Sequence, residues 1–238
     1  MVRLPPWLQS LRLRLGTVTL ATLAVCLFLQ LFFGIGVNLL RSPTLWELYS
    51  QLFALSLDQL QRGHIWTLLA YGAVHDLNDA THVLFNCIGL FYFMPMFESR
   101  RGTRATLRFL LLSVLAGGVL QSLWQLFHVH VLGGEAAGTV GISAAVIAFL
   151  AAFGWHQPKA RVQLMFVLPM EARWLAPVVL GVDFLLFASG RPIAFFAHLG
   201  GYLMAWFLIW GRGDPQFVWQ RIKLQVGGRK ASRLIVVH

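Results

Sequence analysis

Three short groups of polar residues lie inside long apolar stretches of this sequence. They contain His82 and Asn86, then Ser143, and finally His198. Polar side chains at membrane depth are costly, so they are the first candidates for function. A serine beside a histidine could carry out nucleophilic catalysis, because the imidazole can remove the hydroxyl proton as the serine attacks a carbonyl. Ser143 and His198 are therefore the candidate nucleophile and base.

The negative charge that such an attack creates needs hydrogen-bond donors. His82 and Asn86 are four residues apart and share one face of a predicted helix. Both side chains can offer N–H groups, and the backbone N–H of Ser143 at a helix N-terminus would add a third donor. His82 and Asn86 are the candidate oxyanion-stabilising residues, and the set needs no metal or other cofactor.

The composition indicates that these residues lie in a membrane. Of 238 residues 58% are hydrophobic and 12% are charged, which does not fit a water-soluble globule. Apolar runs predict six membrane-spanning helices, because each is long enough to cross about 30 Å of hydrocarbon. The predicted spans are about 16–40, 81–97, 104–127, 139–155, 172–189 and 193–211. Between the first two, about 41–80 is too polar to span and predicts short amphipathic helices at the interface.

Basic residues predict the orientation. Sixteen of the 19 lysines and arginines fall on segments that would face the cytoplasm, and only Arg41, Arg62 and Arg191 would face out. We expect a cytoplasmic segment at 1–15, a membrane domain at 16–211 and a basic cytoplasmic tail at 212–238 near anionic headgroups. Charges clustered at helix ends argue against nucleic acid as a partner. The first apolar run is too long for a signal peptide, and the six-span plan suggests a bacterial plasma membrane.

The orientation brings the candidate residues to one depth. The second, fourth and sixth spans run from outside to inside, and His82, Ser143 and His198 all lie within about 8 Å of their outer ends. Small residues beside Ser143 and His198, such as Gly141, Gly200 and Gly201, would let these helices approach closely. The sequence therefore predicts that the serine and histidine meet near the outer side of the bundle.

These motifs resemble the rhomboid family of intramembrane serine proteases. The resemblance covers about residues 58–211 and rests on His82-x-x-x-Asn86, Gly141-x-Ser143 and Ala197-His198-x-x-Gly201 in that order. It implies an all-α bundle of six transmembrane helices, a Ser143–His198 catalytic pair, and transmembrane protein substrates. Two features depart from the family pattern: Ala144 replaces the usual glycine after the serine, and the pair at Trp66 lacks its arginine.

Other interpretations stay open at this stage. A rhomboid-like protein that binds membrane clients without cleaving them is the main alternative. His75 with His82 and His198 could form a zinc site, although no His-Glu-x-x-His motif is present. Asp183 could belong to a proton path or pack against a polar neighbour. Glu98, beside Arg100 and Arg101, is a candidate for a structural ion pair or a helix-end anchor. A transporter is a weaker alternative, because the sequence has no convincing internal repeats. Cys26 and Cys87 indicate no disulfide. The oligomeric state is left open.

Overall fold

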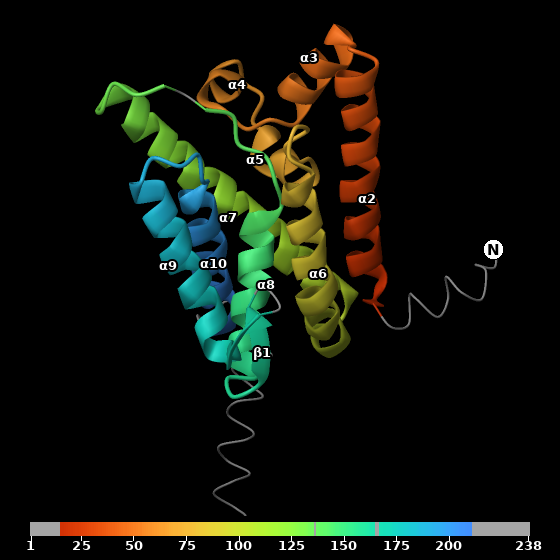
Figure 1. Ribbon diagram of the computed structural model, residues 1–238, viewed down its shortest axis with the longest axis vertical. Coiled ribbons are helices and arrows are strands. Elements are labelled where there is room, and N and C mark those ends of the chain that lie inside the picture. Colours follow the sequence, from red (N-terminus) through yellow and green to blue (C-terminus); the bar gives the residue numbers. More distant parts are fainter. Residues whose placement is uncertain (1–14, 136, 165–166, 211–238) are drawn as a thin grey trace, which may run out of the picture.

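The computed structural model describes residues 15–135, 137–164 and 167–210. Most of the predicted N-terminal segment and the whole basic tail lie outside the described residues. Within these ranges, six helices of fourteen residues or more form the body of the bundle (Figure 1). They are α2 (Thr17–Gly34), α6 (Ala80–Arg101), α7 (Thr103–His130), α8 (Ser143–His156), α9 (Leu175–Ala188) and α10 (Phe195–Trp210).

These helices alternate in direction along the chain, so that α6, α8 and α10 all begin at the same end of the bundle (Figure 1). Thr17–Leu39, α6 and α7 are long and apolar enough to cross a membrane, and α8 and α10 are apolar but shorter. The protein is a multi-pass integral membrane protein, and the number of six spans remains a prediction.

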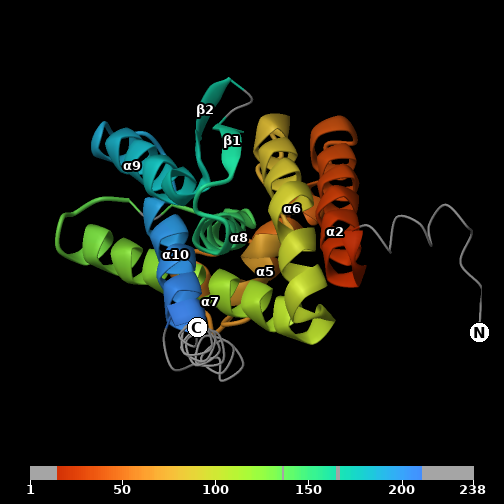
Figure 2. The same ribbon diagram turned by 90° about the horizontal axis from the view of Figure 1, so that it is seen from below.

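Helix α8 lies at the centre, with α6, α7, α9 and α10 around it (Figure 2). Its sequence, SAAVIAFLAAFGWH, is apolar on every face, and a helix of that kind is stable only when neighbours surround it. Nine of its fourteen residues are buried, among them Phe149, which is 1% exposed. Helix α2 is peripheral, with four buried residues, and packs beside α6.

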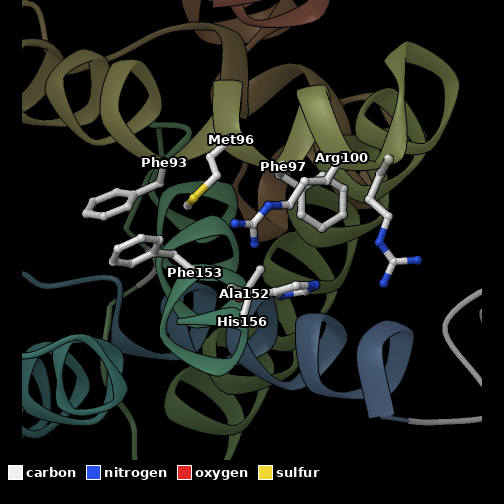
Figure 3. Close-up of a pocket in the computed structure, with 8 residues that line it drawn as sticks. Phe93, Met96, Phe97, Arg100, Ala152, Phe153 and His156 are labelled. Atoms are coloured by element: carbon white, nitrogen blue, oxygen red, sulfur yellow. Dashed lines mark hydrogen bonds between the residues drawn. The ribbon is translucent and has the colours of Figure 1, made fainter. Parts of the chain in front are cut away.

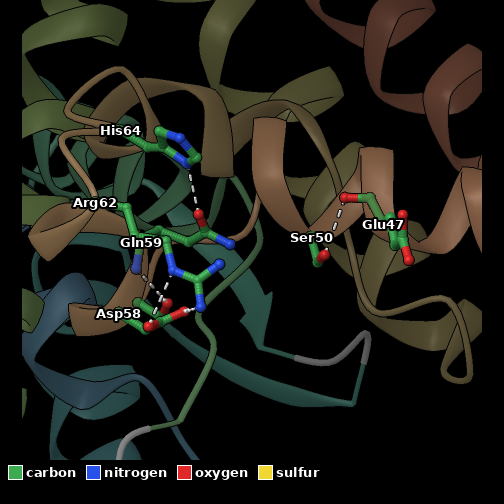
Figure 4. Close-up of polar contacts among 7 residues, drawn as sticks. Glu47, Ser50, Asp58, Gln59, Arg62 and His64 are labelled. Carbon is green, nitrogen blue, oxygen red and sulfur yellow. Dashed lines mark hydrogen bonds and ion pairs between the residues drawn. The ribbon is translucent and has the colours of Figure 1, made fainter.

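The segment between α2 and α6 folds as short helices, as the amphipathic pattern predicts. It contains the π-helical η1 (Ile35–Leu39), α3 (Pro43–Leu52), α4 (Leu57–Gln61), α5 (Thr67–Ala70) and the 3-10 turn η2 (Tyr71–Ala73). Ser42 and Ser56 cap α3 and α4 by accepting from backbone N–H groups. An exposed Arg62–Asp58 ion pair of 3.1 Å and a His64–Gln59 contact of 2.6 Å hold α4 and its following turn (Figure 4).

The structure differs from the predicted elements in two places. Strands β1 (Arg161–Leu164) and β2 (Leu168–Glu171) pair antiparallel between α8 and the 3-10 turn η3 (Ala172–Trp174), so the chain is not purely helical. Helix α8 begins at Ser143 instead of 139, because Thr139 bridges to Leu55 and Gly141 has a φ of 115°, which is incompatible with a helix.

Candidate active site

Ser143 and His198 lie side by side at the start of α8 and of α10. His198 Nε2 is 2.7 Å from Ser143 Oγ, within hydrogen-bond distance, and both residues are only partly exposed. The contact joins residues that are 55 positions apart in the chain. The two groups that the sequence predicts to meet are therefore brought together.

Small residues on three helices make this approach possible. A Cβ added to Gly201 of α10 would lie 2.0 Å from the Ala144 carbonyl oxygen of α8. A Cβ added to Gly200 would lie 2.5 Å from the Ala116 carbonyl oxygen of α7. Since Cβ atoms do not approach other atoms so closely, glycine at both positions lets α10 pack directly on the backbones of α7 and α8. His198 lies on the same helix, two residues before Gly200 and three before Gly201.

The loop that precedes Ser143 is fixed by three neighbouring elements. Gln125 Nε2 of α7 donates to the Ala137 carbonyl at 2.6 Å and to Thr139 Oγ1 at 3.1 Å. Thr139 and Leu55 exchange backbone hydrogen bonds of 2.8 and 3.0 Å. The Gly141 N–H donates to the Tyr71 carbonyl at 2.9 Å. These contacts set the position of Ser143 from outside its own helix.

His82 and Asn86 lie on α6 and face the same loop. A Cβ at Gly141 would be 2.6 Å from His82 Nε2 and 3.6 Å from Asn86 Nδ2. Glycine at this position, two residues before Ser143, therefore leaves room for both side chains. Among the described residues, buried Asn86 Nδ2 has no hydrogen-bond partner. The first N–H groups of α8 also lack partners within their helix. The His82 and Asn86 side chains thus lie beside the loop that leads into Ser143 and the start of α8.

His75 supports the His82 ring. The two ring centroids are 5.2 Å apart in an edge-to-face arrangement, and His75 is fully buried in the loop before α6. Burial, with a smaller contribution from nearby His82, lowers the pKa of His75 to about 3, so its ring is neutral. The zinc alternative gains no support, because no group of three or more His, Cys, Asp or Glu side chains in the described ranges is placed to hold a metal.

Asp183 lies on α9 and contacts His198. Its Oδ2 atom is 2.6 Å from His198 Nδ1, on the opposite side of the ring from Ser143. Of the two interpretations that the sequence left open for Asp183, packing against a polar neighbour describes its position. The signal was available in the sequence, because Asp183 and His198 are similarly close to the short connection between two antiparallel helices. Both therefore lie at one level.

A separate pocket lies at the opposite end of α8. Phe93, Met96, Phe97, Arg100 and Arg101 of α6 and Ala152, Phe153 and His156 of α8 line it (Figure 3). His156 is thirteen residues beyond Ser143, which places it about 20 Å away along the helix. The pocket contains none of the candidate catalytic residues and is lined on one side by the basic residues at the end of α6.

Comparison with known proteins gives the context for this geometry. A model of the Rhomboid domain matches residues 62–214, well over half of the chain. The protein belongs to the rhomboid family. The resemblance inferred from the motifs is confirmed, and with it the membership of a family with an intramembrane protease type of fold.

Two relatives illustrate the similarity to other rhomboid proteins. RHOMBOID-like protein 12, mitochondrial, of Arabidopsis thaliana is 27% identical over 186 residues, which cover 71% of this chain and 54% of that protein. Rhomboid protease GlpG of Yersinia enterocolitica is 26% identical over 200 residues, which cover 83% of this chain and 63% of that protein. The matches span less than two thirds of the length of each of these rhomboid relatives.

Proposed function

We propose that this protein is an intramembrane serine endopeptidase that cleaves transmembrane segments of other membrane proteins. The observation that carries the proposal is the 2.7 Å contact between Ser143 Oγ and His198 Nε2. The relative from Yersinia enterocolitica is named a rhomboid protease, which is consistent with this proposal. The proposed setting is a bacterial plasma membrane with both termini in the cytoplasm.

In the proposed reaction Ser143 Oγ attacks the scissile carbonyl while His198 Nε2 takes its proton. His82, Asn86 and the backbone N–H of Ser143 donate to the oxyanion that forms. His198 then returns the proton to the leaving amine, and water hydrolyses the acyl-enzyme in a second round of the same chemistry. A substrate helix must unwind locally near its outer end, because its carbonyls are otherwise paired within the helix.

The first test is labelling by a fluorophosphonate probe in detergent, followed by cleavage of a reconstituted transmembrane substrate. We expect the wild type to label and cleave, and Ser143→Ala and His198→Ala to do neither while remaining folded. Ser189→Ala is the matched control, because the hydroxyl of this exposed serine at the end of α9 donates to the nearby carbonyls of Leu185 and Leu186. It should behave like the wild type.

The alternative is a client-binding protein without protease activity. Failure of the folded wild type to label, under conditions where a known rhomboid protease reacts, would favour that alternative. Cleavage that persists in Ser143→Ala would overturn the assignment of the nucleophile. Ala144 does not favour the inactive alternative, because its methyl group faces Gly117 of α7.

A further inference from the structure

His198 is held between two side chains from different helices. Asp183 Oδ2 lies 2.6 Å from one ring nitrogen and Ser143 Oγ lies 2.7 Å from the other. The side chains of Asp183 and His198 are 13% and 15% exposed. We propose that Asp183 is a positioning residue for the reaction, so that the site is a Ser143–His198–Asp183 triad instead of a pair. The inference rests on the proposed function.

The carboxylate determines which ring nitrogen carries the proton. An ionised carboxylate can only accept hydrogen bonds, so the contact requires a hydrogen on His198 Nδ1. In the neutral ring Nε2 is then left with its lone pair, and this is the atom that faces Ser143 Oγ. The other tautomer would point a hydrogen at the serine and could not remove its proton. Asp183 therefore selects the form of His198 that acts as a base.

The carboxylate also balances the charge that the reaction creates. When His198 takes the proton from Ser143 it becomes a cation in a site of low solvent exposure, where an unpaired charge is costly. A carboxylate in contact with the opposite side of the ring lowers the free energy of the imidazolium cation when that cation forms. In the described part of the chain the only ion pair formed by Asp183 is the one with His198, so its charge is not compensated by lysine or arginine.

The α9–α10 connection brings Asp183 and His198 to one level of the bundle. Asp183 is five residues before the end of α9, and His198 is three residues after the start of α10. Ser189 and Gly190 end α9 with backbone bonds to the carbonyls of Leu185 and Phe187, and Gly190 has a φ of 79°, which suits glycine. The turn therefore fixes the two side chains at a common level.

A purely structural role is possible on chemical grounds, since a carboxylate at this depth needs a donor. The test must therefore separate positioning from packing. We would compare the wild type with Asp183→Asn, measuring the rate of fluorophosphonate labelling, kcat and KM on a reconstituted substrate, and the thermal midpoint in detergent. The expected loss is about 10²- to 10⁴-fold in kcat and in labelling rate, with KM within about twofold and the midpoint unchanged.

Asp58→Asn is the matched control, because it removes the same charge from an exposed pair with Arg62 far from α9 in the chain. It should leave labelling and kcat unchanged. Asp183→Asn that labels at the wild-type rate would overturn the inference. If Asp183→Asn does not fold, Asp183→Ala is assayed with added formate or with formamide, its neutral counterpart. Recovery with formate alone supports the positioning role, and any other response overturns it.

The outcomes distinguish this inference from the proposed function. If the folded wild type and Ser143→Ala are equally unreactive, the protease assignment fails and the triad with it. If Ser143→Ala abolishes labelling but Asp183→Asn does not reduce it, the protease assignment stands and only the role of Asp183 is wrong.

Discussion

Ser143 and Ala144 are adjacent in the first turn of α8 but face different helices. The hydroxyl of Ser143 points to His198 of α10. The methyl group of Ala144 faces α7, because a Cβ placed on Gly117 would lie only 2.6 Å from it. Because glycine has no side chain, Gly117 leaves space for the methyl group of Ala144. The alanine that departs from the usual family motif is accommodated by packing away from the catalytic atoms.

At this position we predict that Ala144→Gly preserves activity and lowers stability. The free energy of unfolding should fall by about 1–2 kcal/mol, because glycine costs about 0.5–1 kcal/mol in a helix and a buried methyl contributes about 0.8 kcal/mol. Detergent-induced unfolding and the labelling rate provide the measurements. Gly181→Ala on α9, where an added Cβ meets nothing within 4 Å, is a control for glycine exchange. A large gain in the activity of Ala144→Gly would contradict this account.

The candidate catalytic residues were predictable at the residue scale, and their contacts with neighbouring side chains only in part. His82, Asn86, Ser143 and His198 were identified from residue type and spacing, and the structure places them around one loop. Their catalytic roles remain predictions. The contact between Asp183 and His198 was not predicted. Their positions near the α9–α10 connection indicate a common level, but level alone does not tell which neighbouring helix a side chain faces.

Among the elements, α2 is capped at its N-terminus by a side chain of another helix, α6. Glu98 near the end of α6 is 5% exposed and accepts from the backbone N–H groups of Val18 and Thr19 at 2.9 and 3.0 Å. It also accepts from Thr19 Oγ1 at 3.0 Å. The first N–H groups of a helix have no internal partners, so a carboxylate from α6 caps α2 across the helix interface. The sequence-based expectation of a helix-end contact agrees with this arrangement.

We therefore predict that Glu98→Gln loosens α2 without directly affecting the catalytic groups. Loss of charged hydrogen bonds should lower the free energy of unfolding by about 2–3 kcal/mol. Glu47→Gln, on the exposed side of α3, is the matched control and should change stability little. The effect is measured by detergent-induced unfolding and by protease sensitivity of α2. Equal stability of the two variants would show that the cap is dispensable.

The boundaries of elements were less predictable than their existence. The fourth predicted span began at 139, but Thr139 bonds to Leu55 and Gly141 bonds to Tyr71, and α8 begins only at Ser143. The β1–β2 hairpin was missed because each strand has only four residues, too few for periodicity to stand out. In both places tertiary contacts, which no local pattern encodes, decide where the helix begins or the strand forms.

At the scale of the whole molecule, alternating helix directions agree with the charge asymmetry of the sequence. The α7–α8 connection and the α8–α9 connection leave the bundle at opposite ends (Figure 1). Lys159 and Arg161 lie on the second of these connections. If the positive-inside rule holds, that end faces the cytoplasm. The orientation is a prediction that the arrangement makes directly testable.

We expect Glu135→Cys to react with a membrane-impermeant maleimide in intact cells and Lys159→Cys to react only in inverted vesicles. Both positions are exposed in connections at opposite ends of the bundle. Cys26 and Cys87 would first be replaced by alanine to remove the native thiols. Labelling of both positions from the same side would contradict the alternating topology, and the reversed pattern would place the termini outside.

The length of the central helix α8 relates the depth of the candidate site to the thickness of the membrane. Fourteen residues give α8 a length of about 21 Å, whereas a typical hydrocarbon core is about 30 Å thick. If the last turn of α8 lies at the inner boundary of the hydrocarbon core, Ser143 lies below the outer boundary by the difference between these two lengths. The distance from bulk water to Ser143 then depends on the acyl chains of the host lipids. Membrane thickness becomes a physical variable of the proposed reaction, and a thinner membrane would expose a different residue of the same substrate helix at the depth of Ser143.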